Sequence, residues 1–157
     1  MRQTKRLLSL IAVVLIAACT NNGIFNPMTD AAGTYQLTVY AGRSIPATYT
    51  IQPGDPAYPQ YPNGASFVVS GGTMDLNTDG TFIETNNYVT TPTGGASQNS
   101  SFVSSGTWTL SGTSFTLFAP AQNGNGARSV SGTLDVDTIT YQEDNGNGGF
   151  DSFEYKR

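Results

Sequence analysis

Apolar and polar residues alternate along most of the chain after residue 32. Many of these runs begin with a Gly-Thr pair, as at residues 33–37, 72–76 and 106–110. A turn glycine followed by a β-branched residue and a period of two is typical of the start of a β-strand. No stretch after residue 18 keeps a helical apolar period for ten residues or more. The pattern predicts an all-β domain of eight or nine strands, near residues 33–41, 46–52, 66–77, 80–90, 101–110, 113–119, 127–135, 138–143 and 150–156.

Short turns join the predicted strands. Residues 78–80, 111–112 and 135–137 have the composition of hairpin turns. Sequential hairpins favour an up-and-down antiparallel β-barrel of about eight strands, because closure leaves no exposed sheet edge. The segment 33–157 is long enough for eight strands of a small barrel. A Greek-key β-sandwich is the alternative.

The N-terminus has a different pattern. Three basic residues precede the apolar run 7–16, which is closed by Ile16-Ala17-Ala18-Cys19. This is the pattern of a secretory signal, and the run is shorter than the roughly 20 residues of a membrane-spanning helix. The last four residues resemble the lipobox of bacterial lipoproteins, which implies cleavage before Cys19 and lipidation of its thiol. We expect a signal peptide at 1–18, a lipidated tether at 19–32 and a barrel domain at 33–157.

Charge and the anchor indicate where the protein resides. From residue 19 onward the chain has four basic and eleven acidic residues, a formal charge of −7. Nucleic acids bind clustered Lys and Arg, so no nucleic-acid partner is expected. The lipid would hold the protein at a membrane of the bacterial cell envelope. Thr20 stands where some lipoproteins retained at the inner membrane have aspartate, which favours the outer membrane.

Several kinds of chemistry have no support in the sequence. The chain has no histidine, which excludes a Ser-His-Asp triad, and Cys19 is its single cysteine. Asp75 and Glu84 could form a glycosidase-type carboxylate pair, but nothing separates them from solvated strand residues. The segment 144–151 is rich in oxygen ligands and glycine, yet its spacing differs from a calcium loop and predicts a hairpin tip. We expect no enzyme, no metal and no cofactor.

Five short segments in this order, at 33–38, 45–47, 79–82, 106–110 and 153–157, resemble the bacterial lipocalin-like lipoproteins. The resemblance implies an eight-stranded barrel with room for an internal cavity. In lipocalins a tryptophan opens the first strand and an arginine near the chain end packs on it. Tyr35 has the place of that tryptophan here, and Lys156 or Arg157 would supply the cationic cover.

Alternation places a set of large side chains on the inward face of the barrel. As the lining of a cavity they would bind a small apolar or amphipathic molecule. Alternatively they fill a solid core, which the many large aromatic rings favour. The candidate residues are Tyr35, Leu37, Met74, Leu76, Phe82, Glu84, Trp108, Phe115, Phe153 and Tyr155.

Glu84 is the one acidic residue in this set. If it points inward, it needs a tyrosine hydroxyl or an arginine as a partner. The prediction we favour is that its strand bulges or leaves the barrel mouth there, so that Glu84 is in water.

Two functions remain open from the sequence. The first is a membrane-anchored module that binds a small apolar or amphipathic molecule. The second is a protein-interaction, inhibitor or structural envelope lipoprotein with a solid barrel. Such a protein could present loop 53–64, which contains four prolines and two tyrosines, to an envelope protein. The same loop could also be a lid or have no role.

Overall fold

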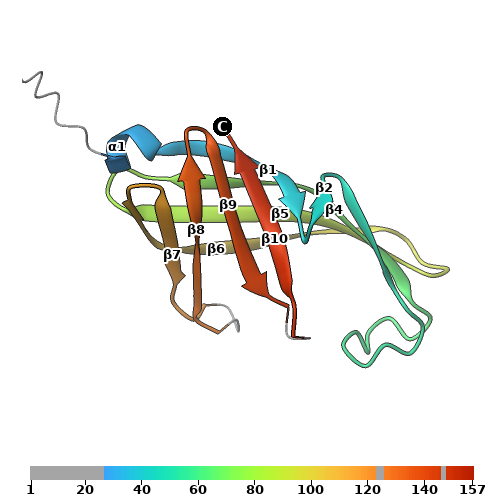
Figure 1. Ribbon diagram of the computed structural model, residues 1–157. Coiled ribbons are helices and arrows are strands. Elements are labelled where there is room, and N and C mark those ends of the chain that lie inside the picture. The colour runs from blue at the N-terminus through green and yellow to red at the C-terminus, as the bar shows by residue number, and fades with distance from the viewer. Residues whose placement is uncertain (1–26, 123–125, 146–147) are drawn as a thin grey trace, which may run out of the picture.

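The computed structural model describes residues 27–122, 126–145 and 148–157, so the predicted signal peptide and Cys19 lie outside the described residues. The described chain forms one short helix and ten strands (Figure 1). Their bounds are α1 Pro27–Ala31, β1 Gly33–Tyr40, β2 Arg43–Ser44, β3 Ala47–Ile51, β4 Ala65–Leu76, β5 Thr81–Pro92, β6 Gln98–Ser111, β7 Ser114–Ala119, β8 Arg128–Asp135, β9 Thr138–Asp144 and β10 Phe150–Lys156.

Eight of the strands form a closed, all-antiparallel barrel. Neighbours follow chain order from β4 to β10, and β1 closes the barrel by pairing with both β10 and β4. Tyr35 lies opposite Met74 on one side of β1, and Leu37 lies opposite Tyr155 on the other. The predicted up-and-down barrel is confirmed, and the Greek-key alternative is wrong.

The three predicted hairpin turns join β4 to β5, β6 to β7 and β8 to β9. In the first, Asp79 accepts hydrogen bonds from the Thr81 amide and hydroxyl at 2.9 and 2.7 Å, and Gly80 has a φ of 82°. A positive φ of this size suits glycine, which has no Cβ to clash with the backbone. Turn chemistry of this kind stabilises the hairpin that the sequence predicts at residues 78–80.

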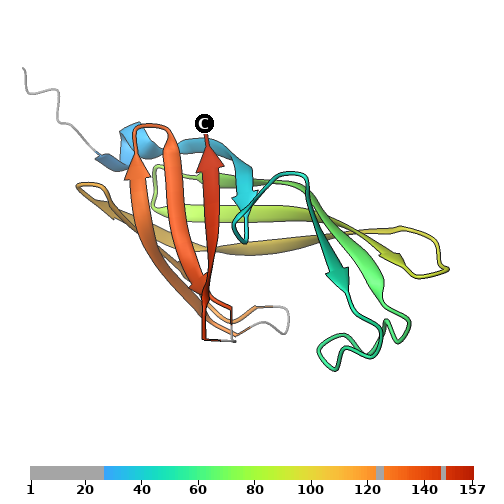
Figure 2. The same cartoon turned by 45° about the vertical axis from the view of Figure 1, so that its right-hand side comes forward.

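Strands β4, β5 and β6 are longer than the barrel requires. They have 12, 12 and 14 residues, whereas β7 to β10 have 6 to 8. Their outer halves project beyond the closed part of the sheet, where β3 pairs with β4 in place of β1 (Figure 2). We call this four-stranded extension the arm, made of residues 47–51, 65–70, 87–92 and 98–103. Loop 53–64 joins two of its strands.

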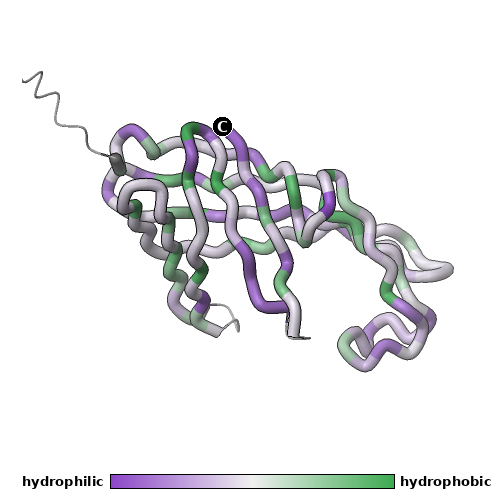
Figure 3. Tube along the Cα trace, viewed as in Figure 1, coloured by the Kyte–Doolittle hydropathy of each residue, from purple (hydrophilic) through white to green (hydrophobic). Residues whose placement is uncertain are grey.

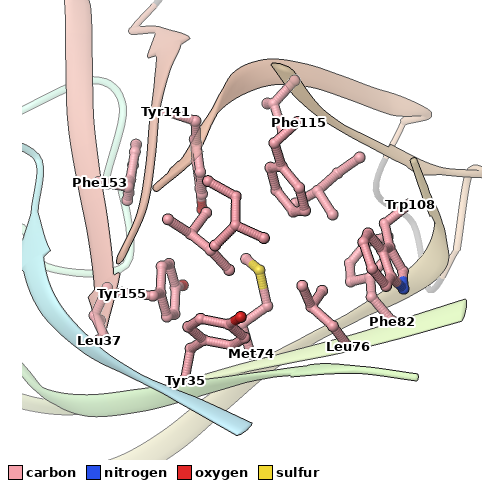
Figure 4. Packing of buried hydrophobic residues seen from close by; sticks show 14 of the residues in the cluster. Tyr35, Leu37, Met74, Leu76, Phe82, Trp108, Phe115, Tyr141, Phe153 and Tyr155 are labelled. Carbon is pink, nitrogen blue, oxygen red and sulfur yellow. The ribbon is translucent and has the colours of Figure 1, made fainter. Parts of the chain in front are cut away.

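Hydropathy alternates along the barrel strands, with apolar positions interrupted by polar ones (Figure 3). The apolar positions converge in the interior, where aromatic and aliphatic side chains from all sides of the barrel pack together (Figure 4). Tyr35, Met74 and Trp108 are at most 1% exposed. Side-chain packing of this kind is the main stabilising contribution in a domain without a disulfide.

The alternation shifts once in β1. The pairing of β1 with β10 has an irregularity between Leu37 and Val39. Val39, which strict alternation places inward, is partly buried, and Tyr40 packs against the core instead. A bulge of this kind re-aims the side chains that follow it.

Helix α1 covers one end of the barrel. The Tyr35 hydroxyl donates a hydrogen bond to the Ala31 carbonyl at 2.6 Å, and Ala31 is buried in the core. Arg157 places its guanidinium 5.3 Å from the Tyr35 ring centre and donates to the carbonyls of Asp30 and Ala32. Of the two cations proposed to cover Tyr35, Arg157 does so, whereas Lys156 pairs with Glu154. The described part of the chain contains no helix long and apolar enough to cross a membrane.

Candidate functional site

All ten candidate cavity residues lie inside the barrel. Each is at most 7% exposed, and the apolar ones belong to one cluster of packed side chains. Two of the ten, Glu84 and Phe153, also line a pocket at the end of the barrel opposite α1. The candidate site is therefore at this open end, which we call the mouth.

Glu84 is 1% exposed, so the prediction that it lies in water is wrong. The irregularity in this part of the sheet falls in β4, between Val69 and Gly71, and β5 keeps its register on both sides of Glu84. The carboxylate accepts hydrogen bonds from the hydroxyls of Tyr155 at 2.6 Å and Tyr141 at 3.0 Å, and from the Asn86 amide at 3.2 Å. It also pairs with Arg128. The other possibility, an inward carboxylate held by tyrosine and arginine, is confirmed.

Arg128 connects the buried carboxylate to the mouth. Its guanidinium pairs with Glu84 on one side and Glu143 on the other, and donates to the Tyr141 hydroxyl at 2.9 Å. Burial lowers the pKa of Arg128, but Glu84, Tyr141 and Glu143 together raise it by more, so its pKa lies above that of a free arginine and the group stays charged. The pair of charges is stable in the barrel because its hydrogen-bonding groups are satisfied.

The same charges act on the tyrosines. Burial raises the pKa of Tyr141 and of Tyr155, and the Glu84 carboxylate raises both further. Their hydroxyls therefore remain protonated and donate to Glu84.

The sequence contained a signal for this cluster that the candidate set did not include. Arg128 stands two residues before Val130 in a strand with a period of two, so the two share a face, and Val130 is buried. Tyr141 stands two residues after Ile139, so it shares a face of its strand with that buried residue. An inward carboxylate needs an inward cation, and Arg128 is the one basic residue between positions 43 and 156.

Asp75 and Glu84 do not meet. Met74 lies opposite Glu84 and points inward, whereas Asp75 is on the other face of β4 and accepts a hydrogen bond from the Thr34 hydroxyl. The barrel wall separates the two acids, so they form no carboxylate pair for glycoside hydrolysis. The described part of the chain also contains no cluster of three or more acidic residues placed to bind a metal.

Two pockets adjoin at the mouth and share Tyr40. The mouth pocket, of about 210 Å³, is lined by Tyr40, Glu84, Asn86, Tyr88, Phe102, Arg128, Glu143 and Phe153. The arm pocket, of about 310 Å³, lies between the barrel and the arm and is lined by Tyr40, Ala41, Tyr49, Thr50, Ile51, Asp55, Tyr58, Phe67 and Asp151.

A continuous set of aromatic rings runs from the mouth pocket to the arm pocket and passes through Tyr40, which lines both. The ring centres of Phe153 and Tyr40 are 5.0 Å apart, and those of Tyr40 and Tyr88 are 6.2 Å apart. Tyr88 stacks on Phe67 at 5.0 Å, and Phe67 contacts Tyr49 at 6.3 Å. We call these five residues the aromatic row. Ring contacts at such distances are favourable and hold the rings in fixed positions.

Loop 53–64 contributes to the arm pocket. Tyr58 and Asp55 line it together with Tyr49 and Phe67 of the arm. Successive turns order the loop, with hydrogen bonds from the Tyr58 amide to the Asp55 carbonyl and from the Tyr61 amide to the Tyr58 carbonyl, both 3.0 Å. The loop is thus a wall of the pocket.

Comparisons of the chain with models of protein families, with curated proteins and with solved structures find no match.

Proposed function

We propose that this protein is a binding module that holds a small amphipathic molecule in the two pockets at the barrel mouth. The aromatic row supports this proposal, since it offers a partly exposed apolar surface beside hydrogen-bonding groups. Ligand sites typically combine apolar walls with a few polar groups in fixed positions. The binding surface is at the mouth, because packed side chains occupy the barrel interior.

The polar groups of the mouth are preorganised. Glu84 and Arg128 are held by each other and by two tyrosine hydroxyls, so they need not reorder when a ligand arrives. A site whose side chains are already fixed loses less conformational entropy on binding.

A protein partner is the second candidate function. Tyr58 is 43% exposed on loop 53–64, and the arm carries the loop beyond the barrel. Aromatic side chains in such positions are common anchors of protein interfaces. The participation of this loop in the arm pocket favours the small-molecule function.

We further propose that the protein is anchored in the cell envelope by lipid on Cys19. Seven residues lie between Cys19 and Pro27, and an extended segment from one to the other reaches at most about 30 Å. Because α1 covers the end opposite the mouth, this anchor would leave the mouth away from the bilayer.

Fluorine NMR tests where a ligand binds. Incorporation of fluorotyrosine labels the eight tyrosines, and Tyr→Phe variants assign their resonances. Short alkyl and aryl amphiphiles should shift Tyr40, Tyr49 and Tyr88 while leaving Tyr35, at the covered end, unchanged. Shifts concentrated at Tyr35 would show binding inside the barrel, and the absence of any shift up to the solubility limit would refute the binding function.

A pair of variants tests the wall of the arm pocket. Tyr58→Ala should weaken amphiphile binding severalfold, because it removes one ring from the pocket. Phe118→Ala is the control, since Phe118 is 49% exposed on β7 and lines neither pocket. Equal losses in the two variants would contradict the assignment.

Cell fractionation tests the anchor. Cys19→Ala should move the protein from the membrane fraction to the soluble fraction, with Thr20→Ala as the control. If the Cys19→Ala protein remains in the membrane fraction, lipid on Cys19 is not what holds it there.

A further inference from the structure

The arm pocket joins aromatic rings to carboxylates. Tyr40, Tyr49, Tyr58 and Phe67 line it, and so do Asp55 and Asp151. An aromatic ring attracts a cation to its face, and a nearby carboxylate adds to that attraction. The combination is therefore selective for positive charge.

The charged groups around the two pockets add up to a net negative charge. Glu84, Glu143, Asp55 and Asp151 supply four negative charges, against the two guanidinium groups of Arg43 and Arg128. The whole chain from residue 19 onward is also acidic. A pocket with this field concentrates cations and repels anions.

Both guanidinium groups already have partners within the protein. Arg128 is paired with two carboxylates. Arg43 donates to the Thr48 carbonyl at 2.7 Å and lies over the Tyr49 ring, 4.7 Å from its centre. Its position also shows that Tyr49 accepts a cation at its face, although Arg43 itself does not line the arm pocket.

Asp151, in contrast, has no cationic side chain paired with it among the described residues. Within the described ranges Asp151 forms no salt bridge. Its partner in the register of β10 and β9 is Glu143, which is also acidic. Burial is the main reason that the pKa values of Tyr40 and Tyr49 are raised. The Arg43 guanidinium lowers the pKa of Tyr49, and the Asp151 carboxylate is the smallest of the causes that raise the pKa of each tyrosine. Its negative charge therefore acts on the two rings at which a ligand would lie.

We infer that the arm pocket binds an organic cation: a substituted ammonium group attached to an apolar body. This inference rests on the proposed small-molecule function and specifies its ligand class. The ammonium group lies between Asp151 and the rings of Tyr40 and Tyr49, and the apolar body extends along the aromatic row toward Phe67.

Three probes with the same alkyl chain separate charge from apolar contact. Hexyltrimethylammonium, hexyl glucoside and hexanoate are titrated by calorimetry into the full chain in maltoside micelles, with protein-free micelles as the blank. The cation should bind about tenfold more tightly than the other two. Equal affinity for all three would overturn the cation inference and leave the proposed function standing. Binding of none of them would count against the proposed function itself.

Two variants with the same change in net charge locate the site. Asp151→Asn should weaken binding of hexyltrimethylammonium about fivefold while leaving hexyl glucoside unchanged. Asp135→Asn, at the hairpin between β8 and β9 near the covered end, should have little effect on either probe. Equal losses in both variants would show that overall charge, and not the arm pocket, attracts the cation, and would overturn the assignment.

Discussion

Glu84 is a charged residue placed where the sequence pattern calls for an apolar one. Its carboxylate is tolerated because Arg128, two tyrosine hydroxyls and the Asn86 amide surround it. Among the described residues, no buried side-chain nitrogen or oxygen lacks a hydrogen-bond partner. A polar network that is fully satisfied in this way fixes the positions of its members, and three of them, Glu84, Asn86 and Arg128, line the mouth pocket.

Removal of this carboxylate should be costly. Glu84→Ala leaves the Arg128 charge with one carboxylate and the Tyr141 hydroxyl without its acceptor, and it leaves the Tyr155 hydroxyl with only the Asn86 side-chain oxygen at 3.1 Å. We therefore expect a loss of about 3 kcal/mol in the free energy of unfolding. Urea denaturation measures it. Glu143→Ala removes the other, more exposed partner of Arg128 and should cost less than about 1 kcal/mol. Comparable losses in the two variants would contradict the prediction that the buried carboxylate stabilises the fold more than the more exposed one.

At the scale of strands, two glycines allow the barrel walls to carry large rings. Gly132 of β8 lies between Phe115 of β7 and Tyr141 of β9 in the register. A Cβ at Gly132 would be 2.1 Å from the Thr140 carbonyl oxygen and 2.7 Å from the Tyr141 Cβ. Gly106 is crowded in the same way by the backbone of Phe118 and Ala119. Strands at these points approach too closely for any side chain.

Gly132→Ala should therefore destabilise the barrel by about 2 kcal/mol, since overpacking forces shifts in the neighbouring strand. The matched control is Gly71→Ala, because a Cβ at Gly71 has no atom within 4 Å and this glycine is also in a strand. The control should change stability by less than about 0.5 kcal/mol. Thermal unfolding followed by circular dichroism compares them, and equal midpoints would contradict the close approach.

All strands except the two-residue β2 were predictable from the sequence, whereas their partial separation into barrel and arm was not. Alternation and turn glycines locate β4, β5 and β6 because these signals are local. That β4 pairs with β1 along one half and with β3 along the other depends on contacts between distant segments. The candidate site shows the same limit. The inward position of Tyr40 results from a bulge after Leu37, which a strict period of two does not reveal.

The whole molecule has two unlike ends. One is closed by α1, with Arg157 bridging the helix, the Tyr35 ring and Asp137. The other is open, aromatic and acidic, and the arm extends from it (Figure 1). The proposed N-terminal anchor would join the domain at the closed end, so it would not interfere with the proposed binding surface.

Tyrosine burial links this architecture to pH. Six of the eight tyrosines have a raised pKa: Tyr35, Tyr40, Tyr49, Tyr88, Tyr141 and Tyr155. Burial is the largest cause in each case. In the unfolded chain a tyrosine ionises near pH 10. A raised folded pKa means that the contribution to stability is complete below about pH 10 and is lost as the pH rises further, because the unfolded state then releases protons that the native state retains.

We therefore predict a steep alkaline transition. Above about pH 10 each deeply buried tyrosine, such as Tyr141 or Tyr155, lowers the free energy of unfolding by up to about 1.4 kcal/mol per pH unit. A small domain has a stability of roughly 5–15 kcal/mol, so a few such groups suffice to unfold it within about two pH units. Phenolate absorbance and circular dichroism, recorded together, should show most of the phenolate forming in step with the loss of β structure.

In Tyr155→Phe, stability at neutral pH should fall because a hydrogen bond to Glu84 is lost, yet the alkaline decline should be less steep because one ionising group is gone. If most tyrosines ionise while the barrel is still folded, their hydroxyls are accessible to solvent and the closed packing around the mouth is wrong.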